Sequence, residues 1–197
     1  MVIQTNKQEL YARQEEGTAC LNFDPQRLWD NFQFLQQHGI VRKDGDPNLP
    51  VLCAGCRNGY ELKMFDDAGY NNVHGFDWSR KMVAVAMLTT KYDIRWDDVC
   101  NIRTFPDYSY GIVYCSHVIE HVLDPKRAIV ELTDKLMSDG ELVIIVPHEP
   151  EPMSKYHITA FRSKADLVEV MDVAGTKLVT VEYDSKWNEY LAIATRA

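Results

Sequence analysis

Two histidines and a glutamate in the stretch CSHVIEHVLDP, residues 115–125, have types and a spacing that could support catalysis. His117 and His121 are four residues apart with Glu120 between them, which is the H-x-x-E-H pattern of inverted zinc peptidases. In a helix both imidazoles would lie on one face, where they could bind one zinc ion. The same letters could instead mark the end of a strand that runs into a helix beside a nucleotide pocket. The elements around this stretch must decide between the two interpretations.

From residue 50 onward, short apolar runs alternate with segments of helical character. Strands are predicted at 50–54, 72–77, 92–96, 110–116, 140–147, 176–183 and 189–197. Helices are predicted at 24–39, 60–69, 79–90, 124–137 and 163–175. Asp24, Asp124 and Ser163 are the expected N-caps, and Asp166 would complete a capping box with Ser163.

Strands that alternate with helices indicate a parallel sheet covered on both faces, whereas the last two strands are joined by a short turn and should pair as a hairpin. We therefore expect an α/β fold: a doubly wound, mostly parallel seven-stranded sheet with a terminal antiparallel hairpin. The 197 residues suit a single domain. A break in composition suggests that residues 1–48 form an N-terminal helical cap or lid on a core of residues 49–197.

A glycine-bearing turn follows the first predicted strand, and an acid ends the second. Gly55 and Gly59 lie in the turn, where glycine permits positive φ and lets a ligand approach the backbone. Asp77 lies 22 residues after Gly55, where a carboxylate can accept both hydroxyls of a ribose. Arg57 stands where the dinucleotide fingerprint G-x-G-x-x-G needs its middle glycine. A nucleoside ligand is therefore favoured over a dinucleotide.

Together, the stretches VLCAGCRNGYEL, VHGFDWS, WDDVCNIRTFPDYSYGIVYCSHVIEHVLDP and GELVIIVPHE resemble a class I S-adenosylmethionine-dependent methyltransferase of the type 11 methyltransferase-domain group. The resemblance covers about residues 50 to 150. It implies a Rossmann-like methyltransferase fold, S-adenosylmethionine as cofactor and methyl transfer as the activity. A protein that binds the cofactor without transferring its methyl group is the alternative.

The resemblance also implies which residues hold the cofactor. The methionine part of the cofactor would contact the turn after the first strand, at Ala54, Gly55, Cys56 and Gly59. Its ribose and adenine fall on residues that follow the second and third strands, namely Asp77, Trp78, Asp98 (in preference to Asp97) and Val99. Its methyl group falls near the residues that end the fourth strand, which are Cys115, Ser116 and His117.

The resemblance explains residues 115–125 without a zinc site. SHVIEHVLDP is similar to the family's passage from strand four to the next helix, where LEHV followed by DP often occurs. Glu120 and His121 would then begin a helical turn, and His121 would bond backbone within it. A peptidase would also need a distant glutamate ligand, such as Glu182 or Glu189, but neither lies in a supporting pattern. We expect no metal site, and the single C-x-x-C at Cys53 does not alter this.

Three positions depart from the family's pattern. Cys53 stands where the family often has an acid, Arg57 replaces a common glycine, and Gly111 lies where the pair FD usually precedes the fourth strand.

Two histidines are expected to act as general bases in methyl transfer: His117 near the expected methyl group and His157 after the fifth strand. Four aromatic residues are expected near the same sheet edge, as a pocket wall or as core: Tyr108, Tyr110, Tyr156 and Phe161.

Composition and charge limit the kinds of methyl acceptor and the cellular locations that are expected for this chain. The net charge is −8, which disfavours a nucleic-acid acceptor because phosphate binding needs a basic face. The chain leaves no room for a separate recognition domain, so a small molecule or glycan is the expected acceptor. No apolar run is long enough to span a membrane, and the N-terminus does not resemble a secretory signal. Five cysteines, an odd number, suit reduced thiols, so a cytoplasmic location is expected.

Overall fold

A seven-stranded sheet forms the centre of the computed structural model, which describes residues 24–41, 45–151, 154 and 156–197. Its strand order is β3-β2-β1-β4-β5-β7-β6. The strands are β1 Val51–Ala54, β2 Val73–Asp77, β3 Asp93–Trp96, β4 Tyr110–Ser116, β5 Leu136–Pro147, β6 Thr176–Asp184 and β7 Glu189–Arg196. All neighbours from β3 to β5 are parallel, and β7 is antiparallel to both β5 and β6. The predicted fold class and the terminal hairpin are confirmed.

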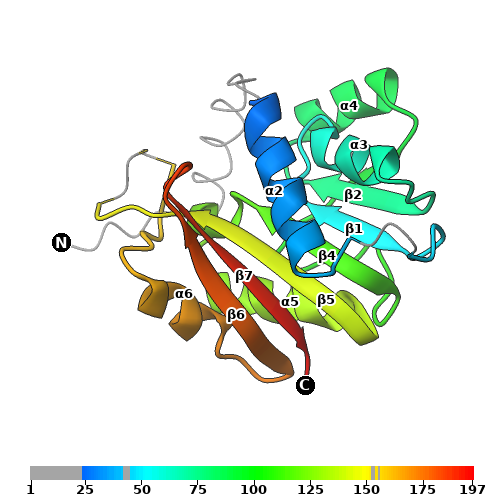
Figure 1. The fold of residues 1–197 in the computed structure, drawn as a ribbon. Helices are drawn as coiled ribbons and strands as arrows, with labels where there is room; N and C mark the ends of the chain where they lie inside the picture. The colour runs from blue at the N-terminus through cyan, green and yellow to red at the C-terminus, as the bar shows by residue number, and fades with distance from the viewer. Residues whose placement is uncertain (1–23, 42–44, 152–153, 155) are drawn as a thin grey trace.

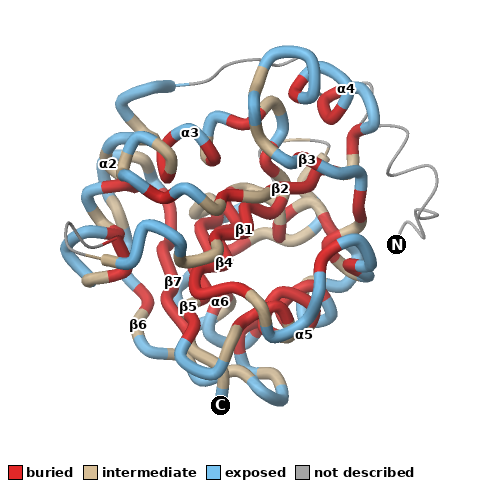
Figure 2. Tube along the Cα trace, turned by 90° about the vertical axis from the view of Figure 1, so that its right-hand side faces the viewer, coloured by how far each residue is buried: buried red, intermediate tan, exposed pale blue. Residues whose placement is uncertain are grey.

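Helices cover both faces of this sheet (Figure 1). They are α2 Pro25–Gln37, α3 Tyr60–Asp67, α4 Arg80–Thr89, α5 Pro125–Lys135 and α6 Lys164–Met171, with a short 3₁₀ turn, η1, at Ile119–His121. Apolar side chains of α2, α3 and α4 pack in one core cluster, and those of α5 and α6 pack in another. The central strands separate the two clusters, and they are buried throughout (Figure 2).

Alternate residues of each central strand belong to opposite faces. In β1, Val51 and Cys53 join the cluster of α2 and α3, whereas Leu52 and Ala54 join the cluster of α5. Both faces are apolar, so the strand reads as a continuous apolar run without polar alternation. This explains why the parallel strands could be recognised from the sequence alone.

The predicted helix starts are confirmed by their caps. Asp24 accepts the backbone N–H of Gln26 at 2.9 Å, and Asp124 accepts that of Arg127 at 3.0 Å. Ser163 begins α6 with a reciprocal capping box, in which Asp166 accepts the Ser163 N–H at 2.7 Å. Such caps satisfy backbone donors that have no partner within the helix.

All the predicted helices end one to four residues earlier than expected. α5 stops at Lys135, not at 137, because Leu136 is already extended and pairs with Tyr110 as the first residue of β5. The Lys135 ammonium is buried there and donates to the carbonyls of Ile102 and Phe105, each at 3.1 Å. α6 stops at Met171, not at 175, and β6 follows a short turn.

Of the predicted N-terminal cap, residues 1–23 and 42–44 lie outside the described residues. The described part contains α2, whose Phe32 and Leu35 pack in the same cluster as β1 and α3. No helix among the described residues is both long enough and apolar enough to cross a membrane.

Candidate active site

The carboxyl ends of β1 and β4 define the site. These neighbouring parallel strands lie where the strand order reverses, because the chain continues from β1 to β2 on one side and from β4 to β5 on the other. Ligands of open α/β sheets bind at such a switch point. The turn after β1 and the residues after β4 meet here: a Cβ built on Gly55 would lie 2.2 Å from Cγ2 of Val118.

The turn after β1 has a left-handed backbone at three positions. Gly55 has φ +68° and Gly59 has φ +91°. Arg57, between them, has φ +47°, so it keeps a conformation that glycine adopts at lower cost. The Cys56 N–H donates to the carbonyl of Phe76 at 3.0 Å, which ties the turn to β2. The departure at Arg57 thus leaves a glycine-like backbone.

Arg57→Gly is expected to raise the free energy of unfolding by about 1 kcal/mol, because glycine relieves the left-handed strain. Urea denaturation of both proteins measures this difference. Arg57→Ala is the control: it removes the guanidinium but keeps the strain, so it should not stabilise. Equal stabilisation by both variants would show that the charge, and not the backbone, is responsible.

Asp77 ends β2 beside this turn. Its carboxylate accepts the Arg57 N–H at 2.9 Å and the Ser79 N–H at 2.7 Å, and the residue is 7% exposed. A carboxylate has about four acceptor positions, so these bonds are compatible with further bonds to a ribose. Ser79, and not Asp77, is the N-cap of α4, since its hydroxyl accepts the Met82 N–H at 3.3 Å. Asp77 therefore has a place suited to the predicted role.

Two acidic residues, Asp97 and Asp98, follow β3 and have different surroundings. Asp97 is buried, and one of its oxygens accepts the N–H groups of Arg103 and Thr104 and the Thr104 hydroxyl. Asp98 is half-buried and accepts the Cys100 N–H at 3.0 Å. Asp97 therefore holds the turn, and Asp98 stays the predicted contact of the adenine.

Two tryptophans lie between the ends of β2 and β3. The rings of Trp78 and Trp96 are 5.2 Å apart, and the Trp96 indole donates to the Trp78 carbonyl at 2.7 Å. The Arg80 guanidinium lies 3.9 Å from the centre of the Trp96 ring. Trp78 stays the predicted neighbour of the adenine, and Trp96 is an aromatic surface that sequence reasoning missed.

Some predicted cofactor residues have side chains in the core. Ala54, Val99 and Cys115 belong to the cluster packed under α5, and Cys56 belongs to the opposite one. Burial raises the pKa of the Cys56 and Cys115 thiols well above the usual range, so both stay protonated. Their backbone atoms are therefore the main groups that they could offer to a cofactor.

Glu61, in the first turn of α3, places a carboxylate near the glycine turn although Cys53 has replaced the usual acid. Burial raises the pKa of Glu61, and the positive charge of Arg57 opposes that shift. Nothing in the sequence pattern singled out this residue.

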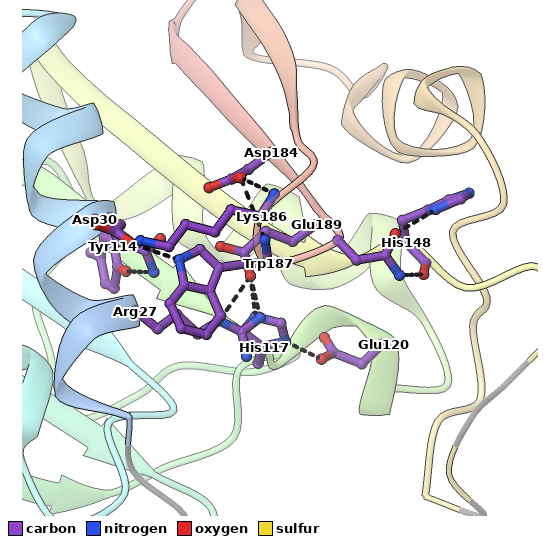
Figure 3. A network of polar contacts seen from close by, with 12 residues as sticks. Arg27, Asp30, Tyr114, His117, Glu120, His148, Asp184, Lys186, Trp187 and Glu189 are labelled. Carbon is purple, nitrogen blue, oxygen red and sulfur yellow. Dashed lines mark hydrogen bonds and ion pairs between the residues drawn. The ribbon is translucent and has the colours of Figure 1, made fainter.

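His117 follows β4 and is the centre of a buried polar network (Figure 3). Its Nδ1 lies 3.2 Å from Oε1 of Glu120, and its Nε2 lies 3.0 Å from Oε2 of Glu189. Arg27 of α2 contacts both His117 and Glu189. His117 itself has φ +55°, a left-handed conformation that is costly for a residue with a Cβ. Sequence reasoning missed Arg27 as a partner, since 90 residues separate it from His117.

The network shifts the titration of its members. Burial lowers the pKa of His117, but hydrogen bonds to Glu120 and Glu189 outweigh burial and raise the pKa above its usual value. Burial raises the pKa of Glu120, but the hydrogen bond and charge of His117 lower it overall. The two carboxylates therefore favour the protonated form of His117, and the charge of Arg27 opposes them.

The loop between β6 and β7 also holds α2. Asp30 accepts the Trp187 indole N–H at 2.7 Å and contacts the Lys186 ammonium (Figure 3). On the inner side of α2, Asn31 donates to the Tyr114 hydroxyl at 3.4 Å. α2 therefore lies over the end of β4 through polar contacts with several elements.

The ligand set of a zinc peptidase is not assembled. η1 spans only three residues and does not include His117, whose nitrogens bond carboxylates. The His121 ring bonds backbone as predicted, but the printed bond is to a segment outside its own turn. Its Nδ1 lies 3.0 Å from the carbonyl oxygen of Tyr156, in the segment after β5.

Two of the aromatic residues predicted at this edge lie elsewhere. Tyr110 begins β4 and is buried in the core, and Tyr108 precedes it, with its ring 3.8 Å from the Arg196 guanidinium. Both lie at the amino end of β4, opposite the site, because a strand of seven residues separates them from Ser116. Phe161 is fully buried.

Comparison with known proteins agrees with this geometry. Residues 52–144 match the model of a methyltransferase domain family, type 11. A protein of Mycolicibacterium smegmatis described as an S-adenosylmethionine-dependent methyltransferase is 29% identical over 133 residues, which cover 64% of this chain and 51% of that protein. A tRNA U34 carboxymethyltransferase of Campylobacter hominis is 30% identical over 99 residues, covering 48% of this chain and 34% of that protein.

Among solved structures, magnesium protoporphyrin IX methyltransferase from Synechocystis PCC 6803 with bound S-adenosylhomocysteine has a TM-score of 0.65 at 18% identity. The match covers 100% of this chain and 90% of that one. The family match over residues 52–144, the relative from Mycolicibacterium smegmatis and the shared fold support a class I S-adenosylmethionine-dependent methyltransferase with S-adenosylmethionine as its cofactor. It spans about half of one curated relative and about a third of the other.

Proposed function

We propose that this protein transfers a methyl group from S-adenosylmethionine to a small-molecule or glycan acceptor by in-line displacement. One observation carries the proposal: the glycine turn, the Asp77 carboxylate and the residues after β4 converge on the same switch point. When bound, the cofactor supplies a methyl group on a sulfonium, which leaves S-adenosylhomocysteine after the acceptor has attacked.

The residues present suit that cofactor. The left-handed turn from Gly55 to Gly59 brings backbone close to a ligand, and Asp77 can accept ribose hydroxyls. Trp78 and Asp98 would contact the adenine, and Ser116 and His117 would line the methyl end. Much of the catalysis would be positioning of the acceptor against the methyl group.

Of the two proposed catalytic histidines, His157 is better suited to accept a proton. His117 bonds two carboxylates that raise its pKa, so it would act as a charged donor that orders the methyl end. His157 lies in a loop, with its Nδ1 2.8 Å from the Glu149 carboxylate, an arrangement that orients a ring for base work.

A net charge of −8 supports the small-molecule or glycan acceptor. The solved relative from Synechocystis is named for a tetrapyrrole, while the relative from Campylobacter is named for tRNA. Incubation with labelled S-adenosylmethionine and panels of metabolites, glycans and tRNA tests this choice. Label transferred only to tRNA would contradict it.

Titration calorimetry with S-adenosylhomocysteine tests the cofactor site. We expect micromolar affinity, about −8 kcal/mol. Asp77→Ala should weaken binding at least about tenfold, because it removes the acceptor for the ribose hydroxyls. Asp67→Ala is the matched control, since Asp67 lies on the exposed face of α3 and pairs only with Lys63 among the described residues. No binding by the folded wild-type protein would refute the proposal, and binding without transfer to any acceptor would identify the non-catalytic alternative.

A further inference from the structure

A second cluster of side chains able to bind a metal lies next to His117. Glu120, His121 and His157 each offer one ligand atom, and these atoms lie within 4.8 Å of one another. Glu120 and His121 come from η1, whereas His157 comes from the segment that follows β5. The rings of His121 and His157 are 4.7 Å apart. The fold therefore assembles a carboxylate and two imidazoles from separate parts of the chain.

Glu120 is fully buried with half of its carboxylate unsatisfied. One oxygen, Oε1, faces His117, but Oε2 has no hydrogen-bond partner among the described residues. A buried carboxylate oxygen without a partner is costly, and such groups are rare in native proteins. A cation bound at Oε2 would supply the missing partner.

Both imidazoles are oriented by hydrogen bonds at Nδ1. The Tyr156 carbonyl can only accept, so the His121 Nδ1 at 3.0 Å carries a proton, and Nε2 is the nitrogen that could bind a metal ion. The His157 Nδ1 lies 2.8 Å from both oxygens of Glu149, which is 2% exposed. Metal-bound histidines have the same outer contacts, to a carbonyl or a carboxylate.

The backbone holds the two halves of the cluster together. The carbonyl of Glu120 accepts the N–H groups of Ile158 and Thr159, at 2.7 and 3.1 Å. The Glu149 N–H donates to the Phe161 carbonyl at 3.0 Å, which closes the loop that contains His157. The ligands are thus positioned before any ion binds.

We infer that Glu120, His121 and His157 form a binding site for a divalent transition-metal ion such as zinc, with Glu149 as the residue that positions His157. Imidazole and carboxylate ligands suit zinc, and three protein ligands leave a fourth position open. The site uses two of the three residues of the H-x-x-E-H motif, Glu120 and His121, and His157 takes the place that the motif assigns to His117. The sequence alone had led us to expect no metal.

The open position suits an acceptor oxygen, an inference that rests on the proposed methyl transfer. The side chains of His121 and His157 are 30% and 17% exposed, whereas that of Glu120 is 1% exposed, so the cluster opens on its histidine side. His117 connects Glu120 to the end of β4, where the methyl group is expected. A metal ion lowers the pKa of a bound hydroxyl. With His157 bound to the metal, its ring would have no free nitrogen to act as the base proposed above. The acceptor hydroxyl would instead release its proton to water, its oxygen would bond the methyl carbon, and the C–S bond would break with its electrons left on sulfur. The acceptor class is therefore a hydroxyl compound and the product a methyl ether.

Calorimetry of the chelator-dialysed full chain with zinc chloride tests the site directly. We expect one zinc ion per chain, and affinity reduced about a hundredfold in His121→Gln and in His157→Gln. Glu149→Gln should weaken binding about tenfold, as expected of a positioning residue. His38→Gln is the matched control, because His38 also lies beside a glutamate, Glu182, but does not belong to this cluster. Cobalt substitution should give visible bands without a thiolate charge-transfer band.

The outcomes separate this inference from the proposed function. Zinc binding that His121→Gln and His157→Gln leave unchanged, or a cobalt spectrum with thiolate bands, would overturn the metal site. A folded protein that binds S-adenosylhomocysteine but no zinc would overturn it too. Zinc binding that requires both histidines would support the site even if S-adenosylhomocysteine did not bind, and in that case the methyltransferase proposal alone would fail.

Discussion

Gly55→Ala is expected to abolish S-adenosylhomocysteine binding and to lower the free energy of unfolding by about 2–4 kcal/mol. Two effects add. The backbone has φ +68°, which costs a residue with a Cβ about 1 kcal/mol. The new Cβ would lie 2.2 Å from Cγ2 of Val118, and such overpacking costs a further 1–3 kcal/mol, roughly. Relief of that clash would separate the turn from the end of β4, where the cofactor is expected to bind.

Gly69→Ala is the matched control for this result. Gly69 has φ +99°, but a Cβ there meets nothing within 4 Å, so only the backbone cost of about 1 kcal/mol applies and ligand binding should persist. Urea denaturation and calorimetry measure both quantities. The double variant Gly55→Ala with Val118→Ala should recover part of the stability, since it removes the atom that clashes. If Gly55→Ala proved as mild as Gly69→Ala, the close approach of these two segments would be wrong.

Glu189→Gln is expected to lower the free energy of unfolding by about 3 kcal/mol, because it leaves Arg27 and His117 without their shared anion in a buried network. Glu189 is fully buried, and its Oε2 faces both cations. The Arg27 side chain is 32% exposed and can regain water, so the lower end of the range for broken buried pairs applies. Glu182→Gln is the control: its exposed pair with His38 should contribute less than about 1 kcal/mol.

The pH dependence of stability tests the same network. The folded-state pKa of His117 is raised, so its contribution is fully present below the unfolded value near 6.5 and is lost as pH rises through the folded pKa. Glu189→Gln removes one of the two bonds that raise this pKa, so the loss should be smaller and should occur at lower pH. Denaturation midpoints measured between about pH 5.5 and 8.5 would show this. Parallel curves for wild type and variant would mean that Glu189 does not determine the titration of His117.

The sequence by itself determined the fold class, because continuous apolar runs mark strands buried on both faces and caps mark where helices begin. The sequence also marked three candidate residues for the site: Gly55, Gly59 and Asp77. They lie at or shortly after the ends of strands, and these ends share one edge of a parallel sheet. The ends of the helices and strands were harder to predict from the sequence. β5 begins at Leu136 because of its pairing with Tyr110, which no local pattern records.

Only the tertiary structure decided what surrounds the HVIEH stretch. His117 meets Arg27 and Glu189, which are 90 and 72 residues away in the chain, and His121 meets His157 across β5. The spacing of a motif predicts which residues are neighbours within one helix or strand. It predicted that His117 and His121 would lie on the same face of a helix. The chain instead forms a 3₁₀ turn there, held by backbone bonds from Ile158 and Thr159 to Glu120. Partners brought together by packing of distant segments leave no periodic trace in the sequence, because their contact depends on the whole sheet and on the loops that cross its edge.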